Sequence, residues 1–469
     1  MNTQSYQAPR TQPSATSTQH RTQPTRRQWI ILVCLFLVSL AAVTPRIYSS
    51  DEIQYFAFLR SLWFDHDLSF ENEYRYFYDR GIARSDGFRE TFLELQTDTG
   101  RRVNFGTIGC AILWSPFYAM GDLVARATGA PRDGFSRPYL AAVAYGSAVY
   151  GFLALVLAIR CAARLGFNAF TGALAVWIGT PLLFYMYVAP PFSHACSAFA
   201  VALFTWVWLR VRGEWSPRGM AALGASGALM LMVREQDVFF AVAVALDYGL
   251  WAPNAQSLKS TAQSILAAAA AFVVVYAPQA AAYLIVNGHL GPHASVGNKM
   301  QWWAPHAFQV MFSPEHGYFM WTPLAMIAIA GLVALAFRRA SEAAILLLMV
   351  ALQIYVDASV ASWTVAGGFA QRRLVSITTA LVIGYAAAWH LTHGRPARVA
   401  VAAVTLLAVY WNLALTAEFA TGLMDRQRLE PRRNAYDAFV TLPRMAPSLV
   451  YRYLFDRSSF YQRANPVPR

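Results

Sequence analysis

Apolar segments long enough to cross a membrane recur along most of this chain. A hydrocarbon core about 30 Å thick is crossed by roughly 20 apolar residues in a helix. Hydrophobic residues make up 57% of the chain, charged residues only 13%, and the mean hydropathy is +0.35. That balance is typical of a polytopic membrane protein and not of a soluble one. The sequence therefore predicts an all-α, polytopic membrane helix bundle.

The excess of positive charge indicates which loops face the cytoplasm. The net charge is +13, and it comes almost entirely from arginine because Lys259 and Lys299 are the only lysines. In a membrane protein such an excess marks cytoplasmic loops, so we expect no nucleic-acid partner. If residues 105–125 do not span, the basic links all lie on the side of the N-terminus: 160–164, 210–218, 259, 338–339 and 395–398.

The positive-inside rule then sets the number and direction of the helices. We predict about eleven spanning helices, with residues 105–125 as an interfacial or re-entrant segment. The predicted spans are 28–47, 138–159, 170–188, 193–209, 218–232, 238–251, 261–286, 319–337, 342–356, 374–389 and 399–419. A disordered cytoplasmic tail, 1–27, precedes this bundle, 28–419. Residues 48–126 form the first outer loop, and 420–469 form a polar tail expected on the same outer side.

The first outer loop is expected to begin with a surface helix. Between Asp51 and Phe64, apolar residues recur at helical spacing. This pattern predicts an amphipathic interfacial helix lying along the membrane. A plain solvated loop is the alternative, and the aromatic content argues against it.

No metal-binding motif is found. The acidic stretch 65–74 matches no known cation-binding loop, and a solvated acidic loop is the favoured interpretation. The cysteines lie in apolar segments at spacings that fit no metal site or disulfide frame, so we predict buried thiols: Cys34, Cys110, Cys161 and Cys196.

With the N-terminus in the cytoplasm, the remaining polar clusters all fall on the outer face. A site that opens toward the outer leaflet requires such a one-sided convergence of acids, bases and aromatic rings. The clusters are 51–52, 193–194, 234–237, 288–317 and 367–373.

Asp51 and Glu52 directly follow the first predicted span. Ionisable groups at membrane depth are costly and indicate a site. The two side chains point about 100° apart on a helix, so only one faces a given cavity, and Tyr55 shares the face of Asp51. A carboxylate here can act as a general base. An equally weighted interpretation is a helix N-cap, because Ser49 or Ser50 precedes the acids.

Arg234 interrupts an apolar region between two predicted helices. It can pair with Glu235 or Asp237, or it can face an anionic ligand; the internal pairing is slightly favoured. His194 follows two prolines at a helix start, where a lone histidine is more often a hydrogen-bonded cap than a catalyst.

Three further basic residues are candidates for anion binding. Lys299 stands among glycines beside Trp302 and Trp303, which suits a phosphate head group, although aromatic belts are common in membrane proteins. Arg372 and Arg373 lie at the outer end of a predicted helix, against the positive-inside trend. That position favours neutralisation of a bound anion. Capture of anionic lipid for structural reasons is the alternative.

The acidic pair Asp51-Glu52 after the first span, the first outer loop and the bundle resemble the C superfamily of membrane glycosyltransferases. That group includes protein O-mannosyltransferases and lipid A aminoarabinose transferases. The likeness covers residues 28–419. The stretches 312–323 (FSPEHGYFMWTP) and 367–373 (GGFAQRR) are similar to those of poorly characterised bacterial members. The first outer loop has no Lys-Pro-Pro motif, so the sugar and acceptor of the aminoarabinose enzymes are not carried over.

The resemblance implies a multi-pass enzyme of the bacterial inner membrane, surrounded by lipids, with its active site facing the periplasm. Its donor would be a polyprenyl-phosphate-linked sugar, and its acceptor a glycan, a lipid or a protein. In a single inverting displacement Asp51 would be the base, and Glu52 would orient it or the acceptor. The residues implied for the donor phosphate are Arg372, Arg373, Lys299 and Arg234. Further substrate-binding residues would be Tyr55, His194, Glu315, His316 and Gln371.

No cofactor and no obligatory metal are implied, because arginines can neutralise the leaving phosphate; a divalent ion is left open. Two alternatives stay open as well. A lipid-linked polysaccharide polymerase or ligase would depend mainly on arginines. A transporter or flippase for a lipid-linked sugar would need no acceptor, but the two halves of the sequence show no internal similarity.

Overall fold

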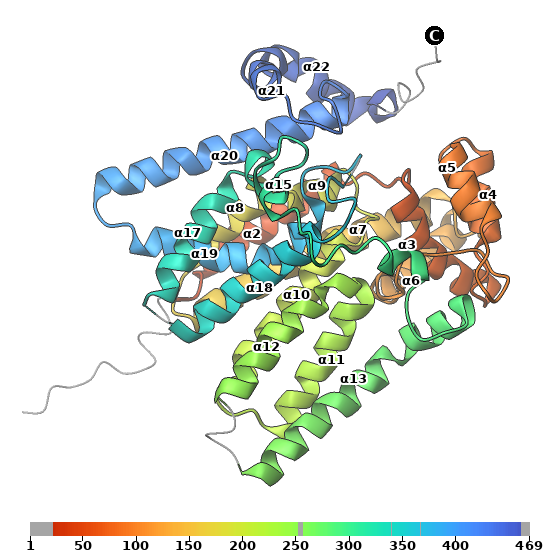
Figure 1. Cartoon of the computed structure of the whole chain (residues 1–469). Coiled ribbons are helices and arrows are strands. Elements are labelled where there is room, and N and C mark those ends of the chain that lie inside the picture. The colour runs from red at the N-terminus through yellow and green to blue at the C-terminus, as the bar shows by residue number, and fades with distance from the viewer. Residues whose placement is uncertain (1–21, 252–256, 339, 366, 461–469) are drawn as a thin grey trace, which may run out of the picture.

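The computed structural model describes residues 22–251, 257–338, 340–365 and 367–460, and their regular structure is helical (Figure 1). Within these ranges the extended pairs are two isolated bridges, Gln96 with Arg102 and Met300 with Val360. The all-α prediction is therefore confirmed. Most of the predicted tail 1–27 lies outside the described residues.

Six helices in the described part of the chain are long and apolar enough to cross a membrane. They are α7 (Arg137–Arg164), α10 (His194–Val211), α13 (Leu258–Asn287), Ser341–Ala358 of α18 (Ala340–Ala358), η5 with α19 (Arg372–Leu391) and α20 (Arg395–Thr421). Shorter apolar helices are α8 (Phe170–Gly179), α11 (Pro217–Val233) and α17 (Leu324–Ala336). Two more predicted spans contain α2 (Arg26–Ser39) and α12 (Val238–Trp251). Each predicted span thus contains helix, while the number that cross stays a prediction.

Two spans that were predicted as continuous helices, 170–188 and 319–337, are each interrupted at a proline. The helix α9 (Leu182–Tyr187) begins after Pro181, and α17 begins after Pro323, separated from α16 (Tyr318–Trp321). Proline has no N–H, and it disfavours helical geometry at the residue before it. The first span is also shorter than predicted, because the helix ends before Thr44 and Pro45.

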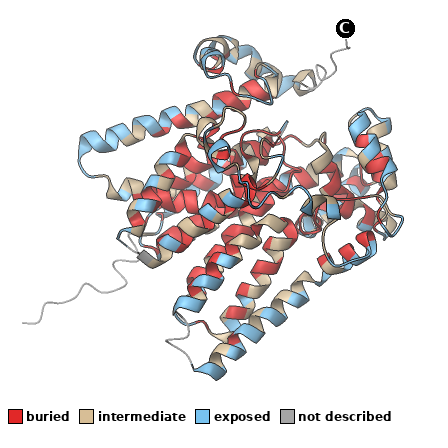
Figure 2. Ribbon diagram, viewed as in Figure 1, coloured by how far each residue is buried: buried red, intermediate tan, exposed pale blue. Residues whose placement is uncertain are grey.

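The helices pack closely around a central group. Helix α10 lies against α7, α17 against α19, and α11 along α13. Gly331 of α17 and Gly384 of α19 permit close contact, because a Cβ on Gly331 would lie 2.1 Å from the carbonyl oxygen of Gly384. Small residues allow membrane helices to approach in this way. Figure 2 shows that exposed residues instead follow α13 and α20 on the outside.

The first outer loop folds back into the protein. Its elements are α3 (Ser50–Arg60), a π-helical turn (Ser61–Asp65), α4 (Glu71–Asp79), α5 (Asp86–Phe88), a second π-helical turn (Arg89–Glu94) and α6 (Gly109–Thr128). The expected surface helix exists as α3, but Ile53, Phe56 and Phe58 are buried. The Phe56 ring meets those of Phe77 and Tyr118 edge-on, so aromatic packing fixes α3 within the outer loop, and its position at the membrane surface stays a prediction.

The acidic stretch 65–74 is also less exposed than expected. Arg60 contacts Asp65, and its Nη1 lies 3.0 Å from Oε1 of Glu73. Glu73 has no exposed surface, and burial raises its pKa to about 7. This ion cluster joins Arg60 to the start of α4, and the prediction of a solvated acidic loop is wrong for Glu73.

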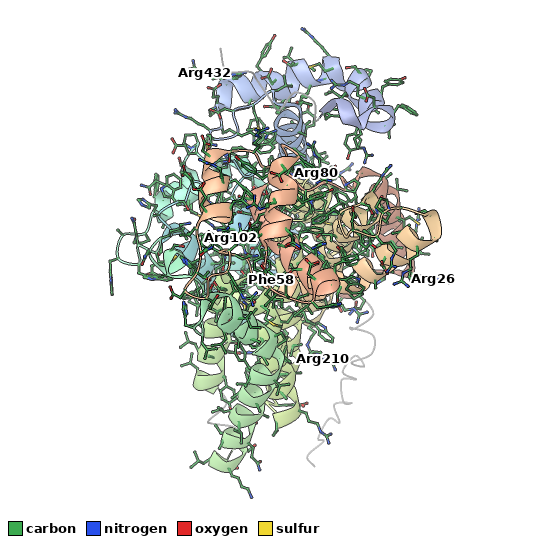
Figure 3. All side chains as sticks on the ribbon, turned by 90° about the vertical axis from the view of Figure 1, so that its right-hand side faces the viewer. Arg26, Phe58, Arg80, Arg102, Arg210 and Arg432 are labelled. Carbon is green, nitrogen blue, oxygen red and sulfur yellow. The ribbon has the colours of Figure 1, made fainter. Side chains whose placement is uncertain are left out.

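The remaining segments cover the ends of the bundle. After α13 come α14 (Ala294–Gly297) and α15 (Ala307–Phe312); after α20 come α21 (Pro431–Tyr436), a π-helical turn (Asp437–Thr441) and α22 (Leu442–Phe455). Figure 3 shows these last helices, with Arg432 labelled, at one end of the molecule, and the group α11–α13 at the other. Among the cysteines, Cys110, Cys161 and Cys196 are buried as predicted. Cys34 is exposed because it lies on the outward face of α2.

Candidate functional site

A polar cavity of about 500 Å³ lies where the five outer polar clusters meet. Each cluster supplies lining side chains although the clusters are far apart in the sequence. These include Asp51 of α3, His194 at the start of α10, Arg234 and Gln236 after α11, Lys299 after α14, and Arg372 and Arg373 of η5. The polar groups that the sequence placed on one face thus surround one space.

An ion pair between Asp51 and Arg372 forms part of the wall. Oδ2 of Asp51 lies 2.8 Å from Nη1 of Arg372, with 41% and 17% of the respective side chains exposed. The Arg372 guanidinium also lies 5.2 Å from the ring centroid of Phe192, a cation–π distance. Two segments more than 300 residues apart in the chain are joined here by opposite charges.

The start of α3 explains why Asp51 faces the cavity and Glu52 does not. Ser49 is the N-cap, and its hydroxyl accepts from the amide of Glu52 at 3.3 Å. Glu52 Oε2 accepts from the amides of Tyr48 and Ser49 at 2.8 and 2.9 Å. Since adjacent helical residues diverge by about 100°, this capping box turns Asp51 toward the cavity. Both earlier interpretations therefore describe real geometry, one for each carboxylate.

Glu52 is completely buried, and desolvation raises its pKa to about 7 against the opposing effect of its hydrogen bonds. Because the folded state binds this proton more tightly than the unfolded state, the protonated carboxyl of Glu52 stabilises the fold fully below pH 4.5. This stabilisation is lost as the pH rises through about 7. Replacing Glu52 with glutamine keeps an acceptor for both amides. In the wild type, titration of Glu52 should change the free energy of unfolding by up to about 3 kcal/mol over this pH range. We expect this change to be absent from the Glu52→Gln variant.

The measurement is the thermal unfolding midpoint of the purified protein from pH 5 to pH 8. The wild-type midpoint should fall over this range by more than that of Glu52→Gln, with Asp98→Asn, an exposed loop position, as the control. Identical pH profiles for wild type and Glu52→Gln would contradict the burial argument.

The face of α3 that carries Asp51 also carries Tyr55, which lines the cavity. Burial raises the pKa of Tyr55 to about 12, so the phenol stays protonated. Next to it, the Gln54 side chain accepts from the amide of Phe105 at 2.8 Å. A Cβ on Gly106 would come within 3.3 Å of the Tyr55 ring. The segment before α6 therefore forms a close-fitting wall, and the sequence did not single out Gln54.

Arg234 is turned toward the cavity and not toward its acidic neighbours. Its guanidinium contacts Nδ1 of His194, and among the described residues no ion pair joins it to Glu235 or Asp237. Asp237 instead accepts from the hydroxyl of Ser197 at 2.6 Å. The predicted internal ion pair of Arg234 is not formed: on the 3-10 turn η4 (Glu235–Asp237), Glu235 accepts from the Tyr283 hydroxyl and Asp237 from Ser197.

A buried polar network lies behind this wall. Gln236 donates to Asp357 of α18 at 3.1 Å, and Gln353, one turn earlier, donates to the carbonyl of Arg373 at 3.5 Å. Asp357 also interacts electrostatically with Arg373 and Arg234. Asp357 was not among the residues predicted from the sequence. An acid near the end of an apolar span was the available signal.

The loop that carries Lys299 is fastened to the end of α18. The amide of Ala361 donates to the carbonyl of Lys299 at 2.8 Å, and that of Gln301 donates to Ser359 at 2.6 Å. Lys299 Nζ lies 5.5 Å from the centroid of the Phe105 ring. These contacts bring the lysine to the cavity rim from a loop that leaves the bundle.

Glu315, His316 and Gln371 do not line the cavity. His316 Nε2 lies 2.9 Å from the Gly368 carbonyl, and its ring stacks on Trp321 with centroids 5.1 Å apart. Gln371 donates to the Trp363 carbonyl at 3.2 Å. These contacts of His316 and Gln371 brace the segment before Arg372, so both residues support the backbone around the cavity.

A second cavity of about 220 Å³ lies on the other side of the ion pair. The two cavities share Asp51, Phe192 and Arg372. The smaller one is rich in aromatic rings and backbone: Phe184, Tyr185, Phe369, Phe419, Gly367 and Gly368. The larger one carries more charge, with four basic side chains (Arg234, Lys299, Arg372 and Arg373) against two acidic ones, Asp51 and Glu235. The described residues contain no group of three or more histidines, cysteines or acids that could hold a metal ion.

These features define a multi-pass membrane protein of helices that enclose a charged cavity. Over 93% of its length the chain matches the crystal structure of ArnT from Cupriavidus metallidurans bound to undecaprenyl phosphate. That match has a TM-score of 0.53 and 15% identity, and it covers 79% of the ArnT chain. The apo form of the same protein matches with a TM-score of 0.51, 13% identity and coverage of 93% and 73%.

At such identities the match shows the fold alone, and the predicted resemblance holds for the arrangement of the helices. No protein-family model and no curated protein matches the sequence.

Proposed function

We propose that this protein is an integral membrane glycosyltransferase that moves a sugar from a polyprenyl-phosphate donor to an acceptor. The observation that carries the proposal is the Asp51–Arg372 pair at the junction of two cavities. A carboxylate there can take a proton from an acceptor, and the arginine can contact a leaving phosphate. The undecaprenyl phosphate in the ArnT structure supports a lipid phosphate as the ligand class.

The charge distribution favours the larger cavity for the donor head group. Its basic excess suits a phosphate that carries a sugar, and planar guanidinium groups bind phosphate oxygens in pairs. Arg373 and Arg234 line this cavity beside Arg372. Acceptor binding falls to the smaller cavity, whose aromatic rings suit the apolar faces of a sugar or another ring.

The reaction is a single displacement with inversion. An acceptor hydroxyl or amine attacks the anomeric carbon and forms a new bond there while its proton passes to Asp51. The bond between the anomeric carbon and the phosphate oxygen breaks, and its electron pair leaves on the phosphate. Arg372 and Arg373 stabilise that developing charge, which is often the largest contribution to catalysis. Glu52 does not touch the reactants in this scheme and orients Asp51 through the helix start.

The membrane topology follows from the same proposal. About eleven helices cross the bilayer, the N-terminus lies in the cytoplasm, and both cavities open toward the periplasm. Labelling of single cysteines at Ser50, Ala294 and Ser362, which are at least partly exposed, tests this arrangement. A reagent that does not cross membranes should reach cysteines at these positions from outside the cell. Labelling from the cytoplasm alone would overturn the proposed side.

Binding of undecaprenyl phosphate to the protein in nanodiscs tests the proposed function. A ligand that binds only the folded state raises the free energy of unfolding, by about 2.7 kcal/mol when its concentration is 100 times its Kd. The unfolding midpoint rises with it. We expect undecaprenyl phosphate to raise the midpoint and undecaprenol, which lacks the phosphate, to leave it nearly unchanged. The control variant Arg398→Gln, at a residue that lines neither of the two cavities, should respond like the wild type. Equal effects of both lipids would contradict a phosphate site.

A further inference from the structure

The helix α22 presents an apolar stripe to its surroundings. Pro443, Pro447, Val450, Tyr451 and Leu454 recur at intervals of three and four residues, which places them on one helical face. Val450 is 57% exposed, Tyr451 64% and Leu454 59%. Exposed apolar stripes of this length mark a surface that meets another apolar phase.

The opposite face of α22 is fixed to the bundle. Leu442 belongs to a small buried cluster with Ala414 of α20 and Ala438, and Leu449 packs against the same cluster. The stripe therefore points away from a docked helix and does not result from a loose terminus.

Contacts at the end of α22 fix its level relative to the membrane. Arg457 donates to the carbonyls of Ala41 and Val43 at 2.7 and 3.1 Å, and the Tyr453 hydroxyl contacts the carbonyl of Ala42. These carbonyls lie at the end of the first membrane helix, just before the segment that leads to Asp51. Helix α22 thus lies at the bilayer boundary on the side of the two cavities.

Exposed apolar residues also lie on α2, the helix whose end α22 contacts. On α2, Leu37 is 58% exposed and Val38 75%, as expected for a helix at the perimeter of the bundle. Exposed arginines, Arg432 and Arg444, stand beside the apolar face of the C-terminal helices. Apolar residues flanked by arginines are typical of helices that lie in the interface of anionic membranes.

We propose that α22 is an interfacial membrane helix whose apolar stripe is embedded among the acyl chains and whose arginines contact anionic lipid head groups. The occupant of this surface is the bilayer itself, because Arg457 holds the end of α22 against the end of the first predicted span, whose helix α2 also exposes apolar side chains. The proposal does not depend on the enzymatic function.

Spin labels on the full-length protein in vesicles test this position. A Cys34→Ser background removes the exposed native thiol, and the other cysteines are buried. Labels are placed at Val450 and Leu454, with Asp98 in the first outer loop as a water-exposed control. In phosphatidylglycerol-containing vesicles, oxygen collisions at the α22 positions should exceed nickel-chelate collisions several-fold relative to Asp98.

Three outcomes would overturn the proposal. Nickel accessibility at Val450 and Leu454 equal to that at Asp98 would place the stripe in water. Spin–spin broadening at Leu454 that disappears on dilution with unlabelled protein would show that a second copy covers it. An unchanged depth in pure phosphatidylcholine vesicles would remove the role of the anionic head groups, because the arginines are expected to lose their partners and the helix to become shallower.

Discussion

Replacing Asp51 with asparagine should lower glycosyl transfer by a factor of about 10² to 10⁴, the usual contribution of a general base. Asparagine has nearly the same shape and cannot take up the acceptor proton. Asp51 lies in the first turn of α3, outside the capping hydrogen bonds, so the helix should form normally in the Asp51→Asn variant. Transfer of a radiolabelled sugar from lipid-linked donors to membrane acceptors measures the loss.

The donor phosphate should still bind to this variant. Arg372 loses its carboxylate partner when Asp51 becomes asparagine, so its charge is free for the phosphate. We expect the stabilisation by undecaprenyl phosphate to be kept or increased. The matched control is Glu52→Gln, which changes the adjacent carboxylate and should keep transfer within about tenfold of the wild type. Near-normal transfer by Asp51→Asn would remove Asp51 from the mechanism.

Replacing Arg372 with glutamine should have an effect of similar size through a different step. Loss of one charged group that stabilises a transition state costs about 10² to 10³ in rate, and here the same group also binds the ground-state phosphate. The Arg372→Gln variant should therefore lose both transfer and the stabilisation by undecaprenyl phosphate. Arg372→Lys should recover part of the binding, since it restores the charge without the planar guanidinium.

The two variants together separate the proposed enzyme from a ligase that relies on arginines. In the proposed mechanism Asp51 and Arg372 act on the same displacement, so the double variant should be little worse than the single ones. The control for Arg372 is Arg398→Gln, which should transfer sugar normally. Full activity of Asp51→Asn combined with an inactive Arg372→Gln would favour the ligase.

The sequence predicted which segments meet, because the positive-inside rule depends only on where arginines fall between apolar runs. That rule placed Lys299 and Arg372 on the side of Asp51, although these residues are far apart along the chain. The helical class followed from the length and composition of the apolar segments.

The direction of individual side chains could not be predicted in the same way. Adjacent acids such as Asp51 and Glu52 are equivalent in a hydrophobicity pattern, and only the capping contacts of Ser49 distinguish them. The burial of α3 depends on aromatic residues from other parts of the outer loop, which no local period reveals. For the same reason the sequence suggested that His316 faces the cavity, whereas its ring contacts the carbonyl of Gly368.

Buried partners were the hardest to recognise. Asp357 is a single acid at the end of an apolar run, and its importance comes from Gln236 and Arg373, which reach it from two other elements. The hydrophobicity pattern of one segment does not predict such contacts between distant segments, because they arise only from tertiary packing.

The ion pair between Asp51 and Arg372, which lines both cavities, limits the size of the group that the proposed enzyme transfers. The cavities of about 500 and 220 Å³ share Asp51 and Arg372 in their walls, so under the proposed function two long substrates would each enter one cavity and meet at this ion pair. The size of the rest of the donor or of the acceptor then does not affect the transfer. Only the transferred sugar must fit beside the ion pair. The same fold would then accept donors and acceptors of very different length.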